Sequence, residues 1–362
     1  MAIRSSPSLI RPVALSLLMS TVSFLRGEVR RPLPALIALL GLAGVAEGAG
    51  FPGPSDTQNI GLRSGWNAVF VHLDPVDPAP AAVFANVPVD KVAAYFPTRT
   101  PVEFIQDPAS EPWKQPGWRA WFAPGLPEAA ISDLHAITGG EAYLVHATAA
   151  ATWTIEGTVI FRPTRWRADS FNFVGFPVDP ANPPTIQGWF AGWTAYLSTT
   201  RNLVYTLDTT ERWVPVARPT TTVIQPNAAY WVFCPGASDY QGPLSVVLPH
   251  GVQGRLDFGD VGESQILKLA NNLPHPVDVA LTLSPATALP LAYEQRLPEL
   301  GDTMRVGLTT PWRLGPLERG EAQSLRLVLD RAAMSQPAGA AVLTLSDDVG
   351  SLIRIPVTGK LP

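Results

Sequence analysis

The sequence predicts an all-β protein made of two tandem related β-barrel or β-sandwich modules and a C-terminal immunoglobulin-like β-sandwich. Three observations lead to this prediction. Proline and glycine are frequent, at 38 and 29 of 362 residues, and they divide the chain into short segments. Within these segments apolar and polar residues alternate, which is the pattern of half-buried strands. One stretch of the sequence also occurs twice, and internal repeats usually reflect repeated structural units.

The repeat is clearest where Asn67–Pro75 (NAVFVHLDP) aligns without a gap to Asn172–Pro180 (NFVGFPVDP). Further landmarks follow in both copies, but their spacing shortens along the second copy. The first copy therefore carries an insertion of about 13 residues before Tyr143. This insertion holds Trp118 and Trp121, which have no counterparts in the second copy.

The repeat sets the expected domain boundaries. We expect a signal peptide region at 1–49, a linker at 50–59, the first module at 60–163, the second at 164–250 and the sandwich at 251–362. We expect a strand pair around a glycine to close each module. The sequence leaves open whether the two modules pack together into one domain with a shared core.

The N-terminal region is typical of a secretory signal. Arg30–Arg31 precede an apolar run at 32–46 that ends in small residues, which predicts cleavage near Gly48 or Ala49. The run is shorter than a bilayer span requires. We therefore expect no membrane span after signal cleavage and an extracellular, cell-surface or periplasmic location. An uncleaved anchor is the alternative, and Met19 is an alternative start.

The C-terminal region is not a third copy of the repeat. Leu325–Leu329 and Ile353–Gly359 alternate as strands do, and Asp347–Gly350 has the composition of a turn. Many short strands over about 110 residues suit an immunoglobulin-like sandwich. The chain has one cysteine, Cys234, so no intrachain disulfide can form, and we expect this residue to be a buried strand residue.

Two resemblances support this organisation. The Gly65-Trp66-Asn67 motif, with the later strand Tyr230–Val232, resembles the GWN/YWV-type β modules of large secreted bacterial surface proteins. The third region resembles the ASPM/SPD-2/Hydin (choice-of-anchor) group through Leu256–Gly259 (LDFG) and Ile355–Gly359 (IPVTG). The second resemblance implies an immunoglobulin-like domain used for spacing or assembly, without catalysis.

No catalytic residue, metal site or cofactor is predicted. The net charge is −4 without a basic block, which argues against nucleic-acid binding. His72 and Asp74 could form an acid–base or metal pair, but the second copy has Pro177 and Asp179 there, so the shared aspartate is interpreted as a turn former. Asp347–Asp348 is interpreted as a turn, with a calcium ligand as the alternative.

Tryptophan carries the main functional signal, because ten of the eleven lie between Trp66 and Trp231. Tryptophans that have an aromatic counterpart at the equivalent position of the other copy, such as Trp113 and Trp213, are expected to fill the core. The unpaired Trp118 and Trp121 are the predicted ligand or partner contacts.

These observations predict a secreted or cell-surface, non-enzymatic structural or interaction protein of a bacterium. Its expected partner is an extracellular protein or polysaccharide. One alternative is a carbohydrate-binding module protein that uses exposed tryptophans, and another is an unrecognised extracellular enzyme.

Overall fold

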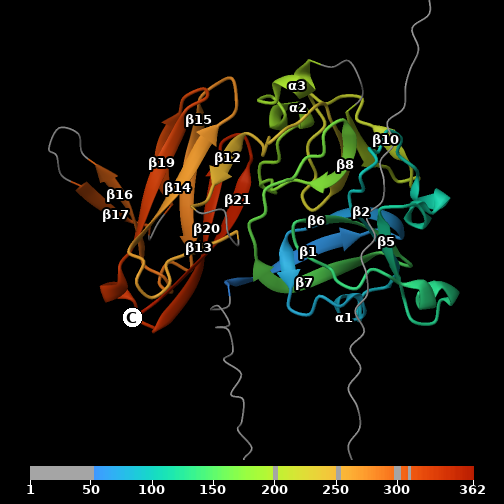
Figure 1. The fold of residues 1–362 in the computed structure, drawn as a ribbon, viewed down its shortest axis with the longest axis horizontal. Coiled ribbons are helices and arrows are strands. Elements are labelled where there is room, and N and C mark those ends of the chain that lie inside the picture. Colours follow the sequence, from blue (N-terminus) through green and yellow to red (C-terminus); the bar gives the residue numbers. More distant parts are fainter. Residues whose placement is uncertain (1–52, 199–202, 250–253, 297–302, 309–310) are drawn as a thin grey trace, which may run out of the picture. The chain divides into compact units, whose positions relative to one another are not determined.

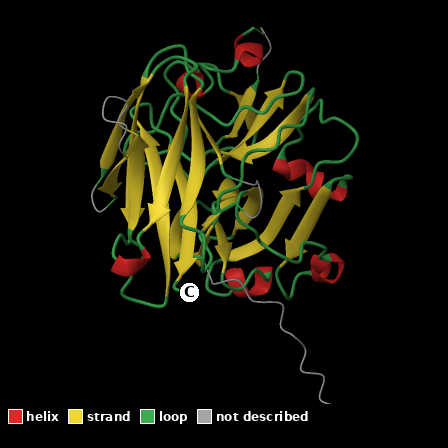
Figure 2. Ribbon diagram, turned by 60° about the vertical axis from the view of Figure 1, so that its left-hand side comes forward, coloured by secondary structure: helices red, strands yellow, loops and turns green. Residues whose placement is uncertain are grey.

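The computed structural model describes residues 53–198, 203–249, 254–296, 303–308 and 311–362. The predicted signal peptide region, 1–49, lies outside the described residues. Strands form nearly all of the regular structure, and the helices are single short turns (Figures 1 and 2). Within the described residues the strands form five open sheets. The predicted all-β class is therefore confirmed.

The first repeat contributes two sheets. A three-stranded sheet has the order β1 (Ser55–Leu62), β7 (Ala151–Val159), β3 (Leu73–Pro75). A four-stranded sheet has the order β2 (Gly65–Val71), β6 (Glu141–Ala147), β4 (Val89–Tyr95), β5 (Trp118–Phe122). The connections hold α1 (Pro80–Val83), η1 (Pro108–Ser110), η2 (Pro112–Lys114) and η3 (Pro127–Ile131). The core of this repeat lies between its two sheets and includes Trp153 and Ile155 opposite Val69 and Val145.

The expected linker at 50–59 is wrong from Ser55 onward, because β1 begins there and pairs with β7 along its whole length. Gln58, Ile60 and Leu62 are buried and alternate with exposed residues. Because the buried residue Gln58 is polar, the sequence of β1 does not show the alternation of apolar and polar residues that predicts a strand. Its amide is satisfied inside the fold, since it donates to the Phe70 carbonyl at 2.9 Å.

The second repeat contributes one four-stranded sheet in the described residues, with the order β10 (Trp213–Pro215), β9 (Val204–Leu207), β11 (Ala229–Cys234), β8 (Ser170–Gly175). Instead of a second sheet, α2 (Ile186–Trp189) and α3 (Thr194–Leu197) precede β9. The core of this repeat packs Ile186, Trp189 and Phe190 with Tyr230 and Val232 of β11.

The strand expected to close the second repeat belongs to the C-terminal sandwich. This strand, β12 (Leu244–Val247), lies within the range 164–250 but pairs with β14 (Ser264–Asn271). Leu244, Val246 and Leu248 alternate into the core of the sandwich. The burial of these side chains explains the pairing.

The C-terminal sandwich consists of two five-stranded sheets (Figure 1). The first has the order β12, β14, β19 (Ala322–Leu329), β16 (Leu291–Arg296), β17 (Thr303–Gly307). The second has the order β13 (Leu256–Asp257), β21 (Leu352–Lys360), β20 (Ala338–Asp347), β15 (Val277–Ser284), β18 (Trp312–Leu317), and η4 (Arg331–Ala333) follows β19. Only β13 and β21 pair in parallel among the described strands. The apolar core between the sheets stabilises the sandwich without a disulfide.

The turn predicted at Asp347–Gly350 is confirmed. Asp347 Oδ1 accepts hydrogen bonds from the backbone N–H groups of Val349, Gly350 and Ser351 at 3.1, 2.7 and 2.7 Å. In the part of the chain that the structure describes, no group of three His, Cys, Asp or Glu side chains is arranged to hold a metal ion.

The two repeats share a core. The aromatic core, defined as the buried cluster between the two four-stranded sheets, includes Trp66 and Leu144 from the first repeat and Phe171, Trp213 and Trp231 from the second. Trp66 and Phe171 occupy equivalent sequence positions and are 5% and 3% exposed. Trp66, with its counterpart Phe171, and Trp213 are buried in this cluster, which confirms the predicted core role of these aromatic positions.

The repeats also meet through the backbone of β2. The N–H of Phe70 donates to the Asn227 carbonyl at 2.8 Å. Phe70 and Gly175 are equivalent positions in the two copies, and they touch each other. A Cβ atom on Gly175 would overlap the ring of Phe70, so glycine leaves the space that the ring occupies.

The asparagines that open the two copies play the same structural role. Asn67 Nδ2 donates to the carbonyls of Gly65 and Arg63, which lie two and four positions earlier. Its Oδ1 accepts a hydrogen bond from the N–H of Arg63. Asn172 makes the same bonds to the residues two and five positions earlier. Both side chains are more than nine-tenths buried. The shared asparagine therefore closes the loop that precedes each strand.

The tyrosines of the last shared strand are also equivalent. The hydroxyl of Tyr143 accepts the N–H of Thr138 at 2.8 Å, and that of Tyr230 accepts the N–H of Gln225 at 2.8 Å. Each bond reaches five residues back along the chain. Burial raises the pKa of both hydroxyls, which keeps them protonated. These bonds fix the start of β6 and of β11 in the same way.

Replacing either asparagine by alanine should destabilise the protein by about 2–4 kcal/mol, because loop N–H and C=O groups lose their partners inside the fold. Urea unfolding of Asn67→Ala and Asn172→Ala would measure this loss. Asn86→Ala is the control, since Asn86 is exposed, and we expect a change within about 0.5 kcal/mol. A large loss in only one copy would contradict the equivalence of the two asparagines.

Candidate functional site

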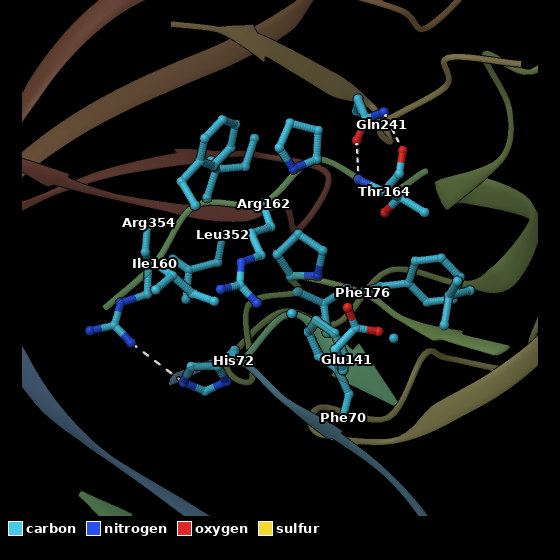
Figure 3. A pocket seen from close by; sticks show the side chains of 18 of the residues that line it. Phe70, His72, Glu141, Ile160, Arg162, Thr164, Phe176, Gln241, Leu352 and Arg354 are labelled. Atoms are coloured by element: carbon cyan, nitrogen blue, oxygen red, sulfur yellow. Dashed lines mark hydrogen bonds between the residues drawn. The ribbon is translucent and has the colours of Figure 1, made fainter. Parts of the chain in front are cut away.

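A cavity of about 1560 Å³ lies among the described residues. It is lined by parts of β1, β2, β8, β12 and β21, together with the segment 159–165 that connects the two repeats. Its volume exceeds the ~300–1,000 Å³ of typical small-molecule pockets. Figure 3 shows the side chains of Phe70, Ile160, Phe176 and Leu352 directed into it. The cavity therefore has an apolar wall and the size of a groove for a chain-like ligand.

A cluster of polar groups from distant parts of the sequence lies at one wall. The guanidinium of Arg354, on β21, reaches Nε2 of His72 at 3.4 Å (Figure 3) and forms an ion pair with the Asp56 carboxylate on β1. The backbone N–H of His72 donates to Gln58 Oε1 at 2.9 Å. Arg354 therefore ties the C-terminal sandwich to the first repeat.

The pKa of His72 is lowered to about 4, first because burial disfavours the charged imidazolium and second because Arg354 is positive. The Asp56 carboxylate acts in the opposite direction. Near neutral pH the imidazole is uncharged, and its Nε2 accepts the hydrogen bond from Arg354. A base this weak is poorly matched to proton transfer near neutral pH.

Asp74 is engaged in a second structural cluster. Its Oδ1 accepts the N–H of Gly139 at 2.8 Å, and its Oδ2 lies 3.3 Å from Nη2 of Arg162. The expectation of a local turn cap holds for Asp179, whose Oδ1 accepts the N–H of Ala181 at 2.9 Å. It is wrong for Asp74, because the N–H that Asp74 binds belongs to a distant loop. His72 and Asp74, which are close in the sequence and were considered as one possible pair, therefore lie in separate clusters.

Glu141 differs from the other carboxylates of the cavity. Its side chain points into the cavity (Figure 3) and has no ion pair or hydrogen bond within the described residues. Although it is exposed to solvent, the surrounding protein raises its pKa through desolvation, and this outweighs the opposite effects of Arg162 and Arg165. Glu141 is therefore a negative group whose neighbours compensate it incompletely.

The predicted contacts Trp118 and Trp121 lie elsewhere and do not line the cavity. Trp121 is 9% exposed in the core of the first repeat, and its ring stacks on Phe84 at a centroid distance of 5.7 Å. Trp118 is half-buried at the aromatic core, with its ring 6.1 Å from Trp231. The expectation of exposed side chains is therefore wrong for Trp121 and only partly met for Trp118.

The spacing of these two tryptophans explains their burial. They are three residues apart on β5, so their side chains leave opposite faces of the four-stranded sheet. One face of this sheet packs within the first repeat and the other against the second repeat, so both faces are covered. All eleven tryptophans lie in the described residues, and each is buried or half-buried.

Cys234 is buried, as predicted for a strand residue. Burial, with a smaller effect of the Asp169 carboxylate, raises the pKa of its thiol to about 11. The thiol is therefore protonated near neutral pH and is not a nucleophile. None of the described helices has the length and apolar character needed to cross a membrane.

No protein-family model and no curated protein matches the chain. Among solved structures, it is similar to the ASH/PapD-like domain 7 of human CEP192, with 15% identity over 33% of this chain and 85% of that domain, at a TM-score of 0.20. It is also similar to a FixG-related protein from Vibrio parahaemolyticus, with 15% identity over 33% of this chain and 94% of that one, at a TM-score of 0.19.

A third similarity, to Escherichia coli alpha-2-macroglobulin activated by porcine elastase, has 11% identity and a TM-score of 0.21, and it covers 86% of this chain but 33% of that one. At these TM-scores the similarities carry no argument about activity, ligand or partner.

The lowered pKa of His72 predicts a pH-dependent stability. Between about pH 6.5 and 4 the unfolded chain binds a proton at His72 that the folded chain does not, so the free energy of unfolding should fall as the pH falls through this window. This contribution is complete above pH 6.5 and amounts to roughly 2–3 kcal/mol. His72→Gln should remove it, which urea unfolding at several pH values would show.

The control for this measurement is His135→Gln, because His135 is exposed and outside both polar clusters. This variant should keep the pH dependence of the wild type. An equal slope in His72→Gln and the wild type would contradict the burial of a neutral His72.

Proposed function

We propose that this protein is a non-enzymatic structural or interaction protein that acts at the surface or in the periplasm of a bacterium, or is secreted by it. One observation carries the proposal: the groups of the cavity that could perform chemistry are used to hold the fold together. His72, Asp74, Arg162 and Arg354 each bind other protein groups, and most of these bonds join separate parts of the chain.

The remaining chemistry of the cavity does not favour catalysis. Acid–base catalysis needs a group whose pKa lies near the working pH and a partner that orients it. Glu141 has no such partner in the described residues, and His72 stays uncharged far below neutral pH. The thiol of Cys234 is buried and protonated. These properties support a binding or scaffolding role.

The duplication supports the same proposal. The residues that both copies share, such as Asn67 with Asn172 and Tyr143 with Tyr230, bind the backbone of their own copy. They maintain a fold that is used twice and then extended by an immunoglobulin-like sandwich. Domains of this type commonly serve as structural or interaction modules.

Carbohydrate binding through tryptophan platforms is less well supported. Stacking on a sugar ring needs an aromatic face that solvent can reach, and every tryptophan of this chain is buried or half-buried. The extracellular location is supported by the basic and apolar pattern of Arg30–Arg31 and 32–46.

Export can be tested with the full-length chain produced in a Gram-negative host. Cell fractions and the mass of the intact protein would give its location and its first residue. We expect recovery outside the cytoplasm of a chain that begins within a few residues of Ala49. A variant that lacks residues 1–49 is the control and should stay in the cytoplasm. A full-length chain retained in the cytoplasm with residues 1–48 intact would contradict the proposed location.

The absence of catalysis can be tested with chromogenic ester, glycoside, phosphate and peptide substrates. We expect turnover by the purified protein to equal that of Glu141→Gln and of His72→Gln, because neither residue has the partners of a catalyst. Turnover by the wild type that disappears in either variant would show an active site in the cavity and would refute the non-enzymatic role.

A further inference from the structure

Strand β17 forms one edge of the first sheet of the sandwich, at the opposite side of that sheet from β12 (Figure 1). In the described part of the chain β17 pairs only with β16. The N–H of Leu308 donates to the carbonyl of Leu291 at 2.8 Å, which fixes the phase of this ladder. Since hydrogen-bonded pairs alternate along antiparallel strands, the N–H and C=O groups of Thr303, Arg305 and Gly307 point away from β16.

The neighbouring ladder between β16 and β19 gives the same phase. The N–H of Asp330 donates to the carbonyl of Pro290 at 3.0 Å, so the backbone groups of Glu294 bind β19. Glu294 lies opposite Arg305 on β17. Because the backbone groups of Glu294 are used on the side of β19, those of Arg305 receive no bond from β16 and remain free on the outer side of β17.

Solvent reaches this free edge. Thr303, Arg305 and Gly307 are all exposed residues, and no hydrogen bond joins their outward backbone groups to another described residue. Five residues of strand extend about 17 Å, and unpaired N–H and C=O groups along such an edge bind a further extended chain as an additional strand. The edge of β17 is therefore an accessible binding surface for an extended segment.

The charges on the outer face of this sheet indicate the chemistry of the segment. Nε of Arg305 lies 3.0 Å from Oε2 of Glu294, and Nε of Arg326 lies 3.3 Å from Oε1 of the same carboxylate. The side chains of the two arginines are 64% and 54% exposed, so one carboxylate serves two accessible guanidinium groups. Lys268 is exposed on the same face. The described strand side chains of this face therefore carry an excess of positive charge, although the whole chain has a net charge of −4.

The opposite face of β17 is apolar. Val306 lies opposite Tyr293, which is buried in the core of the sandwich, so Val306 and Met304 point to the core side of the sheet. Met304 is 42% exposed and Val306 is half-buried, so the core covers them only in part. An added strand with alternating residues would cover this face with apolar side chains and place acidic side chains beside Arg305.

A second copy of this chain fits the edge less well. In an antiparallel pair of two β17 strands that uses all five residues, Arg305 would lie directly opposite Arg305 of the other copy. Like charges in directly opposite positions destabilise a sheet, whereas opposite charges stabilise it. The charge of Arg305 therefore favours an acidic segment over self-pairing.

We propose that an extended acidic segment of a partner protein adds to the free edge of β17 as a further strand and places a carboxylate beside Arg305. This inference rests on the proposed function as an interaction protein and names the class of partner. Export and substrate turnover do not depend on β17, so the failure of this inference and the failure of the proposed function give different results.

The test is selection of a phage-displayed library of random peptides, about nine residues long, on the immobilised full-length protein. We expect enriched peptides in which acidic and apolar residues alternate, because the two faces of β17 differ in this way. The dissociation constants of these peptides for variants of Arg305 then separate the contribution of the charge from that of the backbone.

Arg305→Ala removes the guanidinium group and should weaken binding about two- to fivefold. Arg319→Ala is the control, because it removes an exposed arginine in the turn between β18 and β19, and it should bind as the wild type does. Arg305→Pro also removes an outward N–H, without removing a bond to β16. The enriched peptides should bind Arg305→Pro at least about fivefold more weakly than Arg305→Ala.

A second measurement applies if Arg305→Pro does not fold. Two versions of an enriched peptide carry N-methyl groups, each on one of the two sets of alternate amides. Only one set of amides faces β17 in an added strand, so one version should lose binding to the wild type and the other should keep it. Equal binding of the two versions would contradict the addition of a strand.

Other results would also overturn the proposal. These are no enrichment on the wild type, enriched peptides without acidic residues, and equal binding to Arg305→Pro and Arg305→Ala. A dimer of the wild type in sedimentation that Arg305→Pro dissociates would place a second copy on the edge instead. Binding of the anionic polysaccharide alginate without any peptide would show that the charges of this face serve a different class of partner.

Discussion

The rest of the structure depends on the aromatic core between the two four-stranded sheets. Each of these sheets is apolar on both faces: one face covers the core of its own repeat, and the other packs on the sheet of the other repeat. A sheet with two apolar faces is stable only when both are covered. The two copies therefore form one folding unit, although the sequence presents them as successive modules. This union also brings β1, β2 and β8 together, and these strands form one side of the cavity.

The ion pairs Arg354–Asp56 and Arg162–Asp74 hold the walls of the cavity in place, although the cavity is wide. Its paired groups join segments that are far apart in the sequence, and burial keeps His72 neutral, so that no like charges oppose each other next to Arg354. The pairs are partly buried, and breaking one of them leaves an uncompensated charge on the remaining partner.

The sequence was sufficient for features that depend on local pattern. Alternation identified strands of the sandwich such as Leu325–Leu329 and Ile353–Gly359, and Asp347–Gly350 was recognised as a turn because its composition is typical of one. Features that depend on tertiary pairing could not be predicted. Gln58 hid a strand because its polar side chain is satisfied only by the fold, and β12 was assigned to the wrong unit because alternation does not identify the partner strand.

The candidate site shows the same limit more strongly. His72 and Arg354 are 282 positions apart, and no local signal connects them. Trp118 and Trp121 were chosen because the sequence alignment gave them no counterparts, but β5 holds the same place in its sheet as β10 does in the second copy, and Trp118 pairs with Tyr95 as Trp213 pairs with Leu207. The structure therefore gives Trp118 a counterpart that the sequence alignment missed.

The contact between Phe70 and Gly175 has a consequence for how this chain assembles. The two positions are equivalent, yet one holds a large ring and the other no side chain, so they fit as a knob fits a hole. Two first copies brought together in the same arrangement would set ring against ring, and two second copies would leave a void. Self-pairing of either copy is thus disfavoured, and each copy selects the other within its own chain. The contact therefore favours pairing of the two copies within one chain over exchange of halves between neighbouring molecules.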